Sequence, residues 1–276
     1  MKIKIALVLL ILFIFFTWQN NSITTTQIEI SNSQIPNEFD EFTIVQVSDL
    51  HNKVFRSNQS SLLKTVIEAS PDIIVITGDL VDRRKYNLDD AMLFVDGAVR
   101  IAPVYFVSGN HEAWSGEYDE ISNRLVAAGV IILEDEKIKL DRNGETVEIL
   151  GLSDPDFFTS TYLEGTKYSN LEKSLIEMSD ESVFQILLSH RPELFELYVN
   201  SNIDLIFSGH AHGGQFRLPR IGGLIAPDQG FLPEYTSGSY KEKQSTMVVS
   251  RGLGNSIIPV RIFNRPEIVV VTLKSK

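Results

Sequence analysis

The stretch Ile73 to Asp82, IIVITGDLVD, decides the fold. Four β-branched apolar residues and a threonine run directly into Gly78, and Asp79 follows where the extended segment must end. A continuous apolar run of this length is typical of a strand that is buried on both faces of a parallel sheet. Ligands gather at the carboxyl edge of such sheets, and a preceding glycine lets another group approach closely. Asp79 is therefore well placed to lie between two metal ions.

Four other segments end in the same way. TIVQVS, VYFVS, FQILLS and IDLIFS are short and apolar, and helical patterns separate them, so we interpret them as buried strands of an α/β fold. All five histidines of the chain follow directly after one of these strands. The polar residues that follow the four strands are Asp49-Leu50-His51, Gly109-Asn110-His111-Glu112, His190, and Gly209-His210-Ala211-His212.

These residues have the chemistry of a metal site. Residues i and i+2 of an extended segment point the same way, so Asp49 and His51 can bind one ion together, and so can His210 and His212. The full set exceeds what one ion takes from protein while leaving a position for water, so two divalent cations that share a carboxylate fit better. The candidate ligands are two carboxylates, one amide and four imidazoles: Asp49, His51, Asp79, Asn110, His190, His210 and His212.

A centre of this kind predicts phosphoester hydrolysis. Two divalent cations and two carboxylates leave it cationic by about two charges, which attracts a phosphate. Metal coordination lowers the pKa of water to about 7, and ions about 3.5 to 4 Å apart stabilise both oxygens of an in-line displacement. Nitrogen and oxygen ligands without sulfur suit Mn, Fe, Zn or Co, and the sequence does not choose among them.

The motifs resemble those of the calcineurin-like metallophosphoesterases. The stretches GHAHGGQ, VSRGLG, PVR and RPEI further resemble the bacterial membrane-associated branch of YkuE-like and YaeI-like proteins, and the resemblance covers about residues 40 to 274. Five motifs in the usual order are a specific signal, whereas GNHE alone would be weak. The matching residues are Asp49-x-His51, Gly78-Asp79-x-x-Asp82, Gly109-Asn110-His111-Glu112, His190 and Gly209-His210-x-His212.

The resemblance implies a four-layer αββα sandwich with two metals at the strand ends. It also implies that a metal-bridging hydroxide is the nucleophile, that His111 protonates the leaving alkoxide as general acid, and that Asp82 orients His111. The first metal would be bound by Asp49, His51, Asp79 and His212, and the second by Asp79, Asn110, His190 and His210.

Five of the candidates also have a structural alternative. Asp49 and Asp79 could cap following helices, as could Asp82 at a helix start, and Asn110 could be a turn residue. His190, in Ser-His-Arg-Pro, could instead mark a helix entry.

Three arginines and one further aspartate receive weaker interpretations. Arg84 stands where protein Ser/Thr phosphatases have a glycine, so we do not assign that activity. Arg83 and Arg191 could contact phosphate, although exposed arginines are common. Asp154, in GLSDP, is interpreted as a turn residue.

Composition narrows the function classes. The chain has 276 residues, of which 43% are hydrophobic and 22% charged, as is ordinary for a globular protein. Its formal net charge of -11 makes a nucleic-acid surface unexpected. The absence of cysteine excludes disulfides, zinc fingers and thiolate catalysis.

The chain divides into three predicted parts. Residues 1–21 form an anchor helix or signal segment, residues 22–38 a polar linker with an edge strand at 27–30, and residues 39–276 the metallophosphoesterase domain. No A-x-A-like cleavage site follows the apolar run from Ile5 to Phe16, and Trp18 lies where an interfacial aromatic would, which favours a retained anchor. Lys2 and Lys4 favour a single-pass protein of the cell membrane with an extracytoplasmic catalytic domain. Cleavage would make it a secreted protein.

The predicted function is a membrane-tethered phosphodiesterase. Leu224, Ile225, Phe231 and Leu232, close in sequence to His210 and His212, suggest either a lipid-linked substrate or an approach of this loop to the bilayer. A nucleotide phosphohydrolase is the alternative enzyme, and it would need aromatic side chains that stack on a base. A metal-stabilised exported binding module is the non-enzyme alternative.

Overall fold

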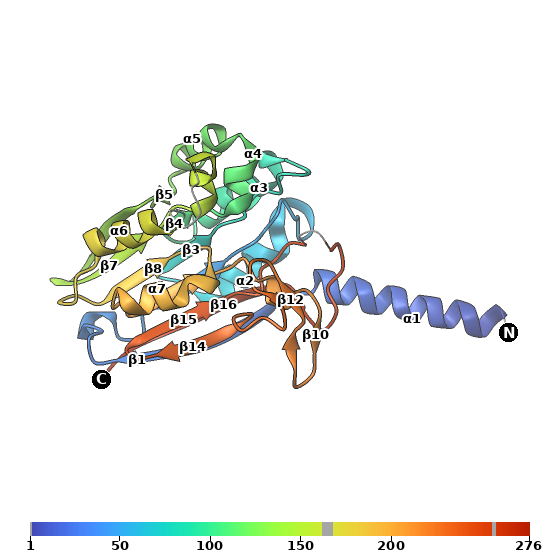
Figure 1. Ribbon diagram of the computed structural model, residues 1–276. Helices are drawn as coiled ribbons and strands as arrows, with labels where there is room; N and C mark the ends of the chain where they lie inside the picture. The colour runs from blue at the N-terminus through green and yellow to red at the C-terminus, as the bar shows by residue number, and fades with distance from the viewer. Residues whose placement is uncertain (1, 162–167, 256–257) are drawn as a thin grey trace.

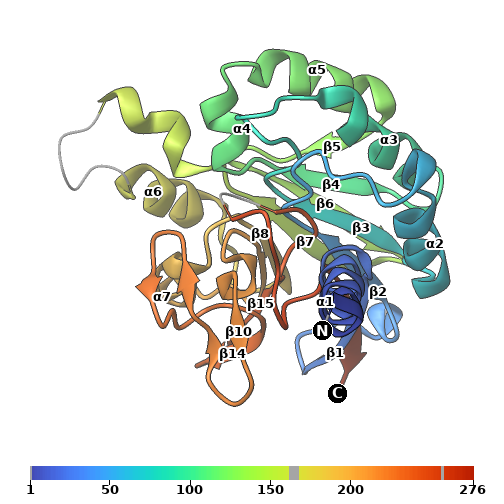
Figure 2. The same ribbon diagram turned by 90° about the vertical axis from the view of Figure 1, so that its right-hand side faces the viewer.

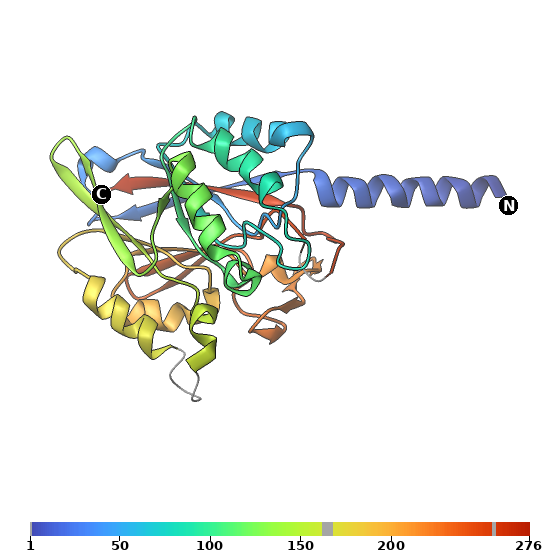
Figure 3. The ribbon, with the colours of Figure 1, turned by 90° about the horizontal axis from the view of Figure 1, so that it is seen from above.

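The computed structural model describes residues 2–161, 168–255 and 258–276. Two six-stranded sheets pack face to face, and helices cover the outer face of each, so the predicted four-layer αββα sandwich is confirmed (Figure 1). Seen from above, the helix α1, Lys2–Asn21, projects from one end of the domain (Figure 3). Met1, at the start of the expected anchor segment, lies outside the described residues.

The first sheet has the strand order β1-β16-β2-β3-β4-β5. β16 pairs antiparallel with β2, and the other neighbours pair in parallel. The predicted strand at the deciding stretch is β3, and all five of its residues are buried. The bounds are β1 Thr24–Asn32, β2 Thr43–Val47, β3 Ile73–Thr77, β4 Val104–Val107, β5 Ile131–Ile132 and β16 Glu267–Ser275.

The second sheet has the order β14-β15-β9-β8-β7-β6. β15, β9, β8 and β7 run parallel, and each edge strand pairs antiparallel. β6 and β7 form a hairpin, and Asn143 and Gly144 make its turn. The bounds are β6 Glu136–Arg142, β7 Glu145–Gly151, β8 Gln185–Leu188, β9 Leu205–Ser208, β14 Gly238–Glu242 and β15 Ser245–Val249.

Helices occupy the outer layers and short connections. Asn87 starts α3 by accepting a hydrogen bond from the backbone of Asp90 at 3.2 Å, and Gly129 ends α5 with a φ of 96°. The α-helices after α1 are α2 Ser60–Ala69, α3 Leu88–Ala98, α4 Asn110–Ser115, α5 Tyr118–Ala128, α6 Ser169–Met178 and α7 Phe195–Asn200. Single 3-10 turns include Ser57–Gln59, Pro192–Leu194 and His212–Gly214.

Three apolar clusters hold the layers together. The central one joins the facing sides of the two sheets, for example Ile44 and Val75 against Ile149 and Phe207. A second lies between the first sheet and α2, α3 and α5, and a third between the second sheet and α6 and α7. Because apolar burial contributes about 25 cal/mol per Å², these clusters fix the positions of the strand ends.

The expected linker at residues 22–38 needs a correction. Residues 24–32 form β1, which pairs with β16 over nine residues and extends beyond the predicted edge strand at 27–30. Its exposed face carries polar side chains, which is why the segment resembles a linker in sequence. The domain therefore begins directly after α1, since only residues 22 and 23 lie between α1 and β1.

Candidate metal centre

The candidate ligands converge at one end of the sandwich. They follow β2, β3, β4, β8 and β9, whose carboxyl ends meet there (Figure 1). The backbone turns sharply after these strands, and five ligands have a left-handed φ between 48° and 62°. Such a conformation costs about 1 to 3 kcal/mol in a residue other than glycine and concentrates at functional sites. The five residues are Asp49, His51, Asp79, His210 and His212.

Asp79 lies at the centre of the group. Its Oδ2 is 3.5 Å from Nε2 of His51 on one side and 3.4 Å from Nε2 of His190 on the other. Its Oδ1 accepts a hydrogen bond from the backbone N–H of His111 at 2.8 Å. One carboxylate thus faces two sets of imidazoles.

The first set lies around His51 and His212. Their Nε2 atoms are 3.2 Å apart, and Nε2 of His212 is 3.4 Å from Oδ1 of Asp49. With Asp79, these residues place one ligand atom each within 4.8 Å of one another. All four side chains are buried.

The second set lies around His190 and His210. Nδ1 of His190 donates to the carbonyl of Thr77 at 2.7 Å, so its Nε2, directed at Nδ1 of His210 3.2 Å away, is the nitrogen that can face a cation. Asp79 completes the group. Asn110, at the start of α4, is also buried, and its Oδ1 has no hydrogen-bond partner among the residues that the structure describes.

The donor set fits divalent cations. Oδ2 of Asp49 and Oδ1 of Asn110 are buried without a partner, which is costly unless a ligand satisfies them. Burial lowers the pKa of His51 to about 3 and raises that of Asp49 to about 6. Burial would also lower the pKa of His190, but Asp79 and Asp49 outweigh it and raise that pKa to about 10. The two carboxylates thus favour positive charge at this site.

His111 lies beside these ligands without belonging to either set. Its Nδ1 accepts the backbone N–H of Arg83 at 3.2 Å and is 3.6 Å from Oδ1 of Asp82. The carboxylate of Asp82 is engaged by Arg84 through Nε at 3.1 Å and Nη2 at 3.0 Å. The predicted pair is therefore close but not hydrogen bonded, and the proton of neutral His111 is on Nε2.

Glu112 ties the loops together, a role that sequence reasoning did not assign. Its side chain is fully buried. Its carboxylate accepts backbone N–H groups of Asp79 and Gly109 at 2.8 Å and of Val81 at 3.1 Å. The GNHE motif therefore holds the loop after β3 against the loop after β4.

Arg191 has a different role from the one considered in the sequence. It is buried and does not lie open to a phosphate. Its Nε and Nη2 contact both carboxylate oxygens of Asp154 at 2.6 and 2.8 Å, so Asp154 is an ion-pair partner as well as a turn residue. Nη1 of Arg191 donates to Oδ2 of Asp228 at 2.6 Å, and the same oxygen is 2.8 Å from Nε2 of His210. Asp228 thus contacts Nε2 of the candidate ligand His210. The sequence did not indicate this contact, which forms only in the folded structure.

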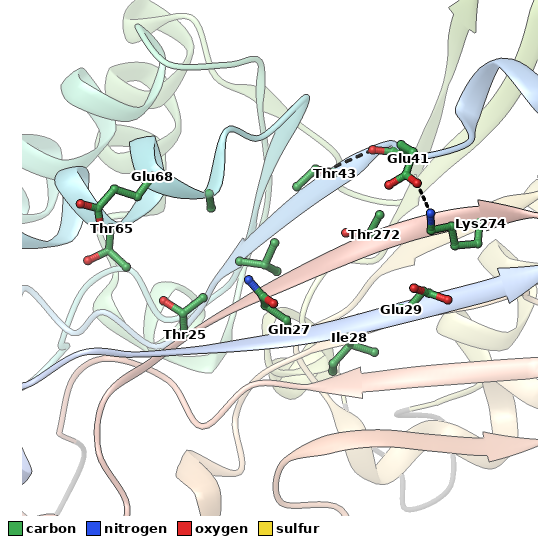
Figure 4. A pocket seen from close by; sticks show the side chains of 12 residues that line it. Thr25, Gln27, Ile28, Glu29, Glu41, Thr43, Thr65, Glu68, Thr272 and Lys274 are labelled. Atoms are coloured by element: carbon green, nitrogen blue, oxygen red, sulfur yellow. Dashed lines mark hydrogen bonds and ion pairs between the residues drawn. The ribbon is translucent and has the colours of Figure 1, made fainter.

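A cavity of about 200 Å³ opens onto the candidate ligands. Arg83, His111 and Trp114 line it, as do Pro227 and Asp228. A larger cavity of about 660 Å³ lies against β1 and β16 (Figure 4). The side chains labelled there include no histidine, and the pair Glu41–Lys274 closes one part of it, so we place the chemistry at the smaller cavity.

Comparison with known proteins decides the family. The family model for calcineurin-like phosphoesterases matches residues 42–214, which is more than half of the chain. The chain is a calcineurin-like phosphoesterase. This membership makes it a metal-dependent phosphoester hydrolase, so the non-enzyme binding module is set aside.

Relatives of this calcineurin-like phosphoesterase span most of its length. The metallophosphoesterase YkuE of Bacillus subtilis (strain 168) is 35% identical over 261 residues, covering 92% of this chain and 86% of the relative. A metallophosphoesterase of Aquifex aeolicus (strain VF5) is 30% identical, covering 86% of each. A transmembrane protein with a metallophosphoesterase domain from Danio rerio is 30% identical over 90% of this chain, which spans 56% of that protein.

The fold has a solved counterpart. The phosphopantetheinyl hydrolase PptH from Mycobacterium tuberculosis superimposes with a TM-score of 0.51, covering 78% of this chain and 91% of that protein. Its sequence identity is 16%, so the likeness concerns the fold alone.

Proposed function

We propose that this calcineurin-like phosphoesterase is a dinuclear phosphodiesterase that α1 tethers to the membrane. The observation that carries the proposal is the carboxylate of Asp79, whose Oδ2 lies within 3.5 Å of imidazoles from both candidate sets. A carboxylate shared in this way supports two neighbouring cations. Bound divalent cations would lower the pKa of water at the site and stabilise the attacking and leaving oxygens of an in-line displacement.

His111 is proposed as the general acid. It lines the cavity, and its Nε2 carries the proton because Nδ1 accepts from Arg83. Burial lowers the pKa of His111, whereas the nearby charges of Asp79 and Asp82 favour the protonated ring. To act as the acid, the ring would take a second proton on Nδ1, give up its contact with the backbone N–H of Arg83 and turn Nδ1–H toward Asp82, 3.6 Å away. The proton on Nε2 would then pass to the leaving oxygen and leave a neutral ring.

The charges around the cavity favour a diester. Arg84 is paired with Asp82, and Asp228 adds a carboxylate to the wall. A phosphodiester carries one negative charge, whereas a monoester carries up to two. Because Asp82 already engages Arg84, that arginine is less available to balance the second charge of a monoester, and Arg191 already neutralises Asp228.

Membrane tethering rests on α1. This helix is 20 residues long with a mean hydropathy of 2.0 across its most apolar stretch, and 6% of that stretch is buried. Lys2 and Lys4 precede the apolar run and favour a cytoplasmic N-terminus, which would leave the catalytic domain outside. The Danio rerio relative, described as a transmembrane protein, is consistent with this arrangement.

Trp114 favours a second candidate, a nucleotide phosphohydrolase. Its ring lines the cavity, is 42% exposed, and lies 5.8 Å from the ring of His111. Base stacking on an aromatic ring contributes about 1 to 3 kcal/mol, so a nucleotide could bind with its base on Trp114 and its phosphate at the candidate ligands.

The test uses the full chain in detergent, purified without chelator. We expect about two ions per chain by elemental analysis, fewer in Asp79→Asn, and faster hydrolysis of a generic diester than of the matching monoester. His111→Ala should keep its metal and lose most of its activity. Trp114→Ala should raise KM for nucleotides alone if the second candidate holds. A folded chain that binds no metal and cleaves neither ester would refute the proposal.

A further inference from the structure

The end of the sandwich that carries the candidate ligands is also the end from which α1 projects. Only residues 22 and 23 lie between α1 and β1, which runs parallel to β16, so both strands start at the α1 end. β2 is antiparallel to β16 and therefore finishes there, as do its parallel neighbours β3 and β4. Figure 2 looks onto this end, with α1 pointing toward the viewer.

α1 joins the domain through side-chain contacts and not through a flexible linker. The guanidinium of Arg265 lies 4.8 Å from the ring centre of Trp18. The backbone N–H of Arg261 donates to Oδ1 of Asn20 at 2.9 Å, and Gln19 is 2% exposed. Lys53, two residues from His51, donates to the carbonyl of Asn20 near the end of the helix. The direction of α1 is therefore fixed relative to the catalytic face, by which we mean the end of the sandwich that carries the candidate ligands.

The apolar part of α1 is short for a bilayer. The run from Ile5 to Phe16 is about 18 Å long at 1.5 Å per residue. The hydrocarbon core is about 30 Å thick, and a short span draws its flanking residues inward or thins the bilayer. The ring of Phe15, near the domain end of this run, lies 5.9 Å from the ring of Phe263. This contact places Phe263 beside the apolar part of the helix. Its side chain is 53% exposed.

Two small hairpins carry further exposed apolar side chains at this end. They are β10 Arg217–Leu218 with β11 Gly222–Gly223, and β12 Ile225–Ala226 with β13 Gly230–Phe231. The backbone N–H of Leu224, between them, donates to the carbonyl of Gly214 at 3.0 Å, two residues after His212. The exposed fractions are 62% for Ile221 in the turn of the first hairpin, 76% for Phe231 at the end of β13, and 60% for Leu232 directly after it.

We propose that this catalytic face lies against the bilayer that α1 crosses, with four side chains in the interfacial layer: Ile221, Phe231, Leu232 and Phe263. We call these four the apolar rim. Exposed apolar side chains that gather beside a membrane span are stabilised by leaving water. Arg220 and Arg56 are exposed nearby and can meet lipid phosphates. The cavity at the candidate ligands then opens at the membrane surface. The inference depends on the proposed tethering by α1.

The absence of cysteine allows a direct test on the full chain. Phe231→Cys and Phe263→Cys probe the apolar rim. Leu9→Cys probes α1, where this residue is 61% exposed. Val126→Cys, on α5, is the matched control because Val126 is equally apolar and 62% exposed. Each variant is labelled with an environment-sensitive fluorophore and reconstituted in vesicles of phosphatidylcholine with some phosphatidylglycerol, with or without lipids brominated on the acyl chain.

We expect brominated lipid to quench the label at Leu9 most, those at Phe231 and Phe263 to an intermediate degree, and that at Val126 hardly at all. If Leu9 is quenched while both rim labels behave like Val126, tethering stands and the membrane-facing orientation is wrong. If Leu9 is not quenched, tethering itself fails and the inference fails with it. Thermal unfolding of each labelled variant checks that the fold is retained.

Discussion

At the scale of single residues, the metal centre extends beyond its candidate ligands. Oδ2 of Asp228 lies 2.8 Å and Nη1 of Arg191 lies 3.1 Å from Nε2 of His210, so these two residues occupy that nitrogen and Nδ1 of the ring is left to bind a cation. Arg191 holds the same carboxylate, and Asp154 holds Arg191 in turn. The orientation of His210 therefore depends on a series of ion pairs that runs from Asp228 through Arg191 to the buried Asp154.

Removing this support should weaken metal binding. We expect Asp228→Ala to lower the affinity for Mn²⁺ by about 10- to 100-fold, because His210 loses the acceptor that fixes its tautomer. Titration calorimetry of the metal-free protein would measure the change. Asp228→Asn keeps an acceptor and should recover part of the affinity.

Glu234→Gln is the matched control, because Glu234 is an exposed acid six residues away in the same loop. Equal affinity of wild type and Asp228→Ala would show that Asp228 does not position His210.

The sequence predicted the candidate ligands because each follows a strand in a short motif. The supports could not be predicted in the same way. Glu112 and Arg191 are buried by chain segments far from them in sequence, and nothing in their local patterns indicates which carboxylate or backbone group they will meet. Local sequence specifies ligand chemistry, whereas tertiary packing specifies what holds the ligands.

At the scale of elements, the buried strands were predictable and the edges were not. β3 and β9 are continuous apolar runs because both of their faces are covered. β1, TTTQIEISN, alternates between exposed and partly buried positions and contains few strong apolar residues, so it resembles a linker. β16 pairs with β1 and β2, which brings the two ends of the chain together. No local sequence pattern predicts this pairing.

Asp204, at the start of β9, links the pH dependence of stability to strand pairing. It is 5% exposed, and its Oδ2 accepts the backbone N–H of Gln185 in β8 at 2.9 Å. Burial raises its pKa from 3.8 to about 6. Between these values the folded chain holds a proton that the unfolded chain has released. The contribution of this bound proton to the free energy of unfolding is therefore lost as pH rises from about 4 to about 6.

We expect the unfolding free energy of wild type, relative to Asp204→Asn, to fall by about 2 kcal/mol between about pH 4 and pH 6 and then stay level. Urea unfolding followed by circular dichroism at several pH values would measure it. Asp180→Asn serves as control, since Asp180 lies on the surface beside β8 and its pKa is lowered by hydrogen bonds from Ser182. A constant difference across this range would mean that Asp204 titrates normally.

At the scale of the whole molecule, α1 and the domain behave as one body. The segment that follows α1 is a paired strand, so the chain offers a protease no open stretch there. We expect brief digestion of the full chain in detergent with a protease of broad specificity to leave residues 24–32 uncut, as mass spectrometry would reveal. Digestion in urea is the control. Early cleavage within β1 under native conditions would indicate that this segment is a flexible linker after all.

The parallel pairing of β1 and β16 also has a mechanical consequence. Their nine paired positions run from Thr24 with Glu267 to Asn32 with Ser275. A force that pulls the two ends of the chain apart acts along these strands, so it loads the ladder in shear and strains its hydrogen bonds together. An antiparallel pair pulled from one end would unzip bond by bond. The protein should therefore resist stretching between its termini.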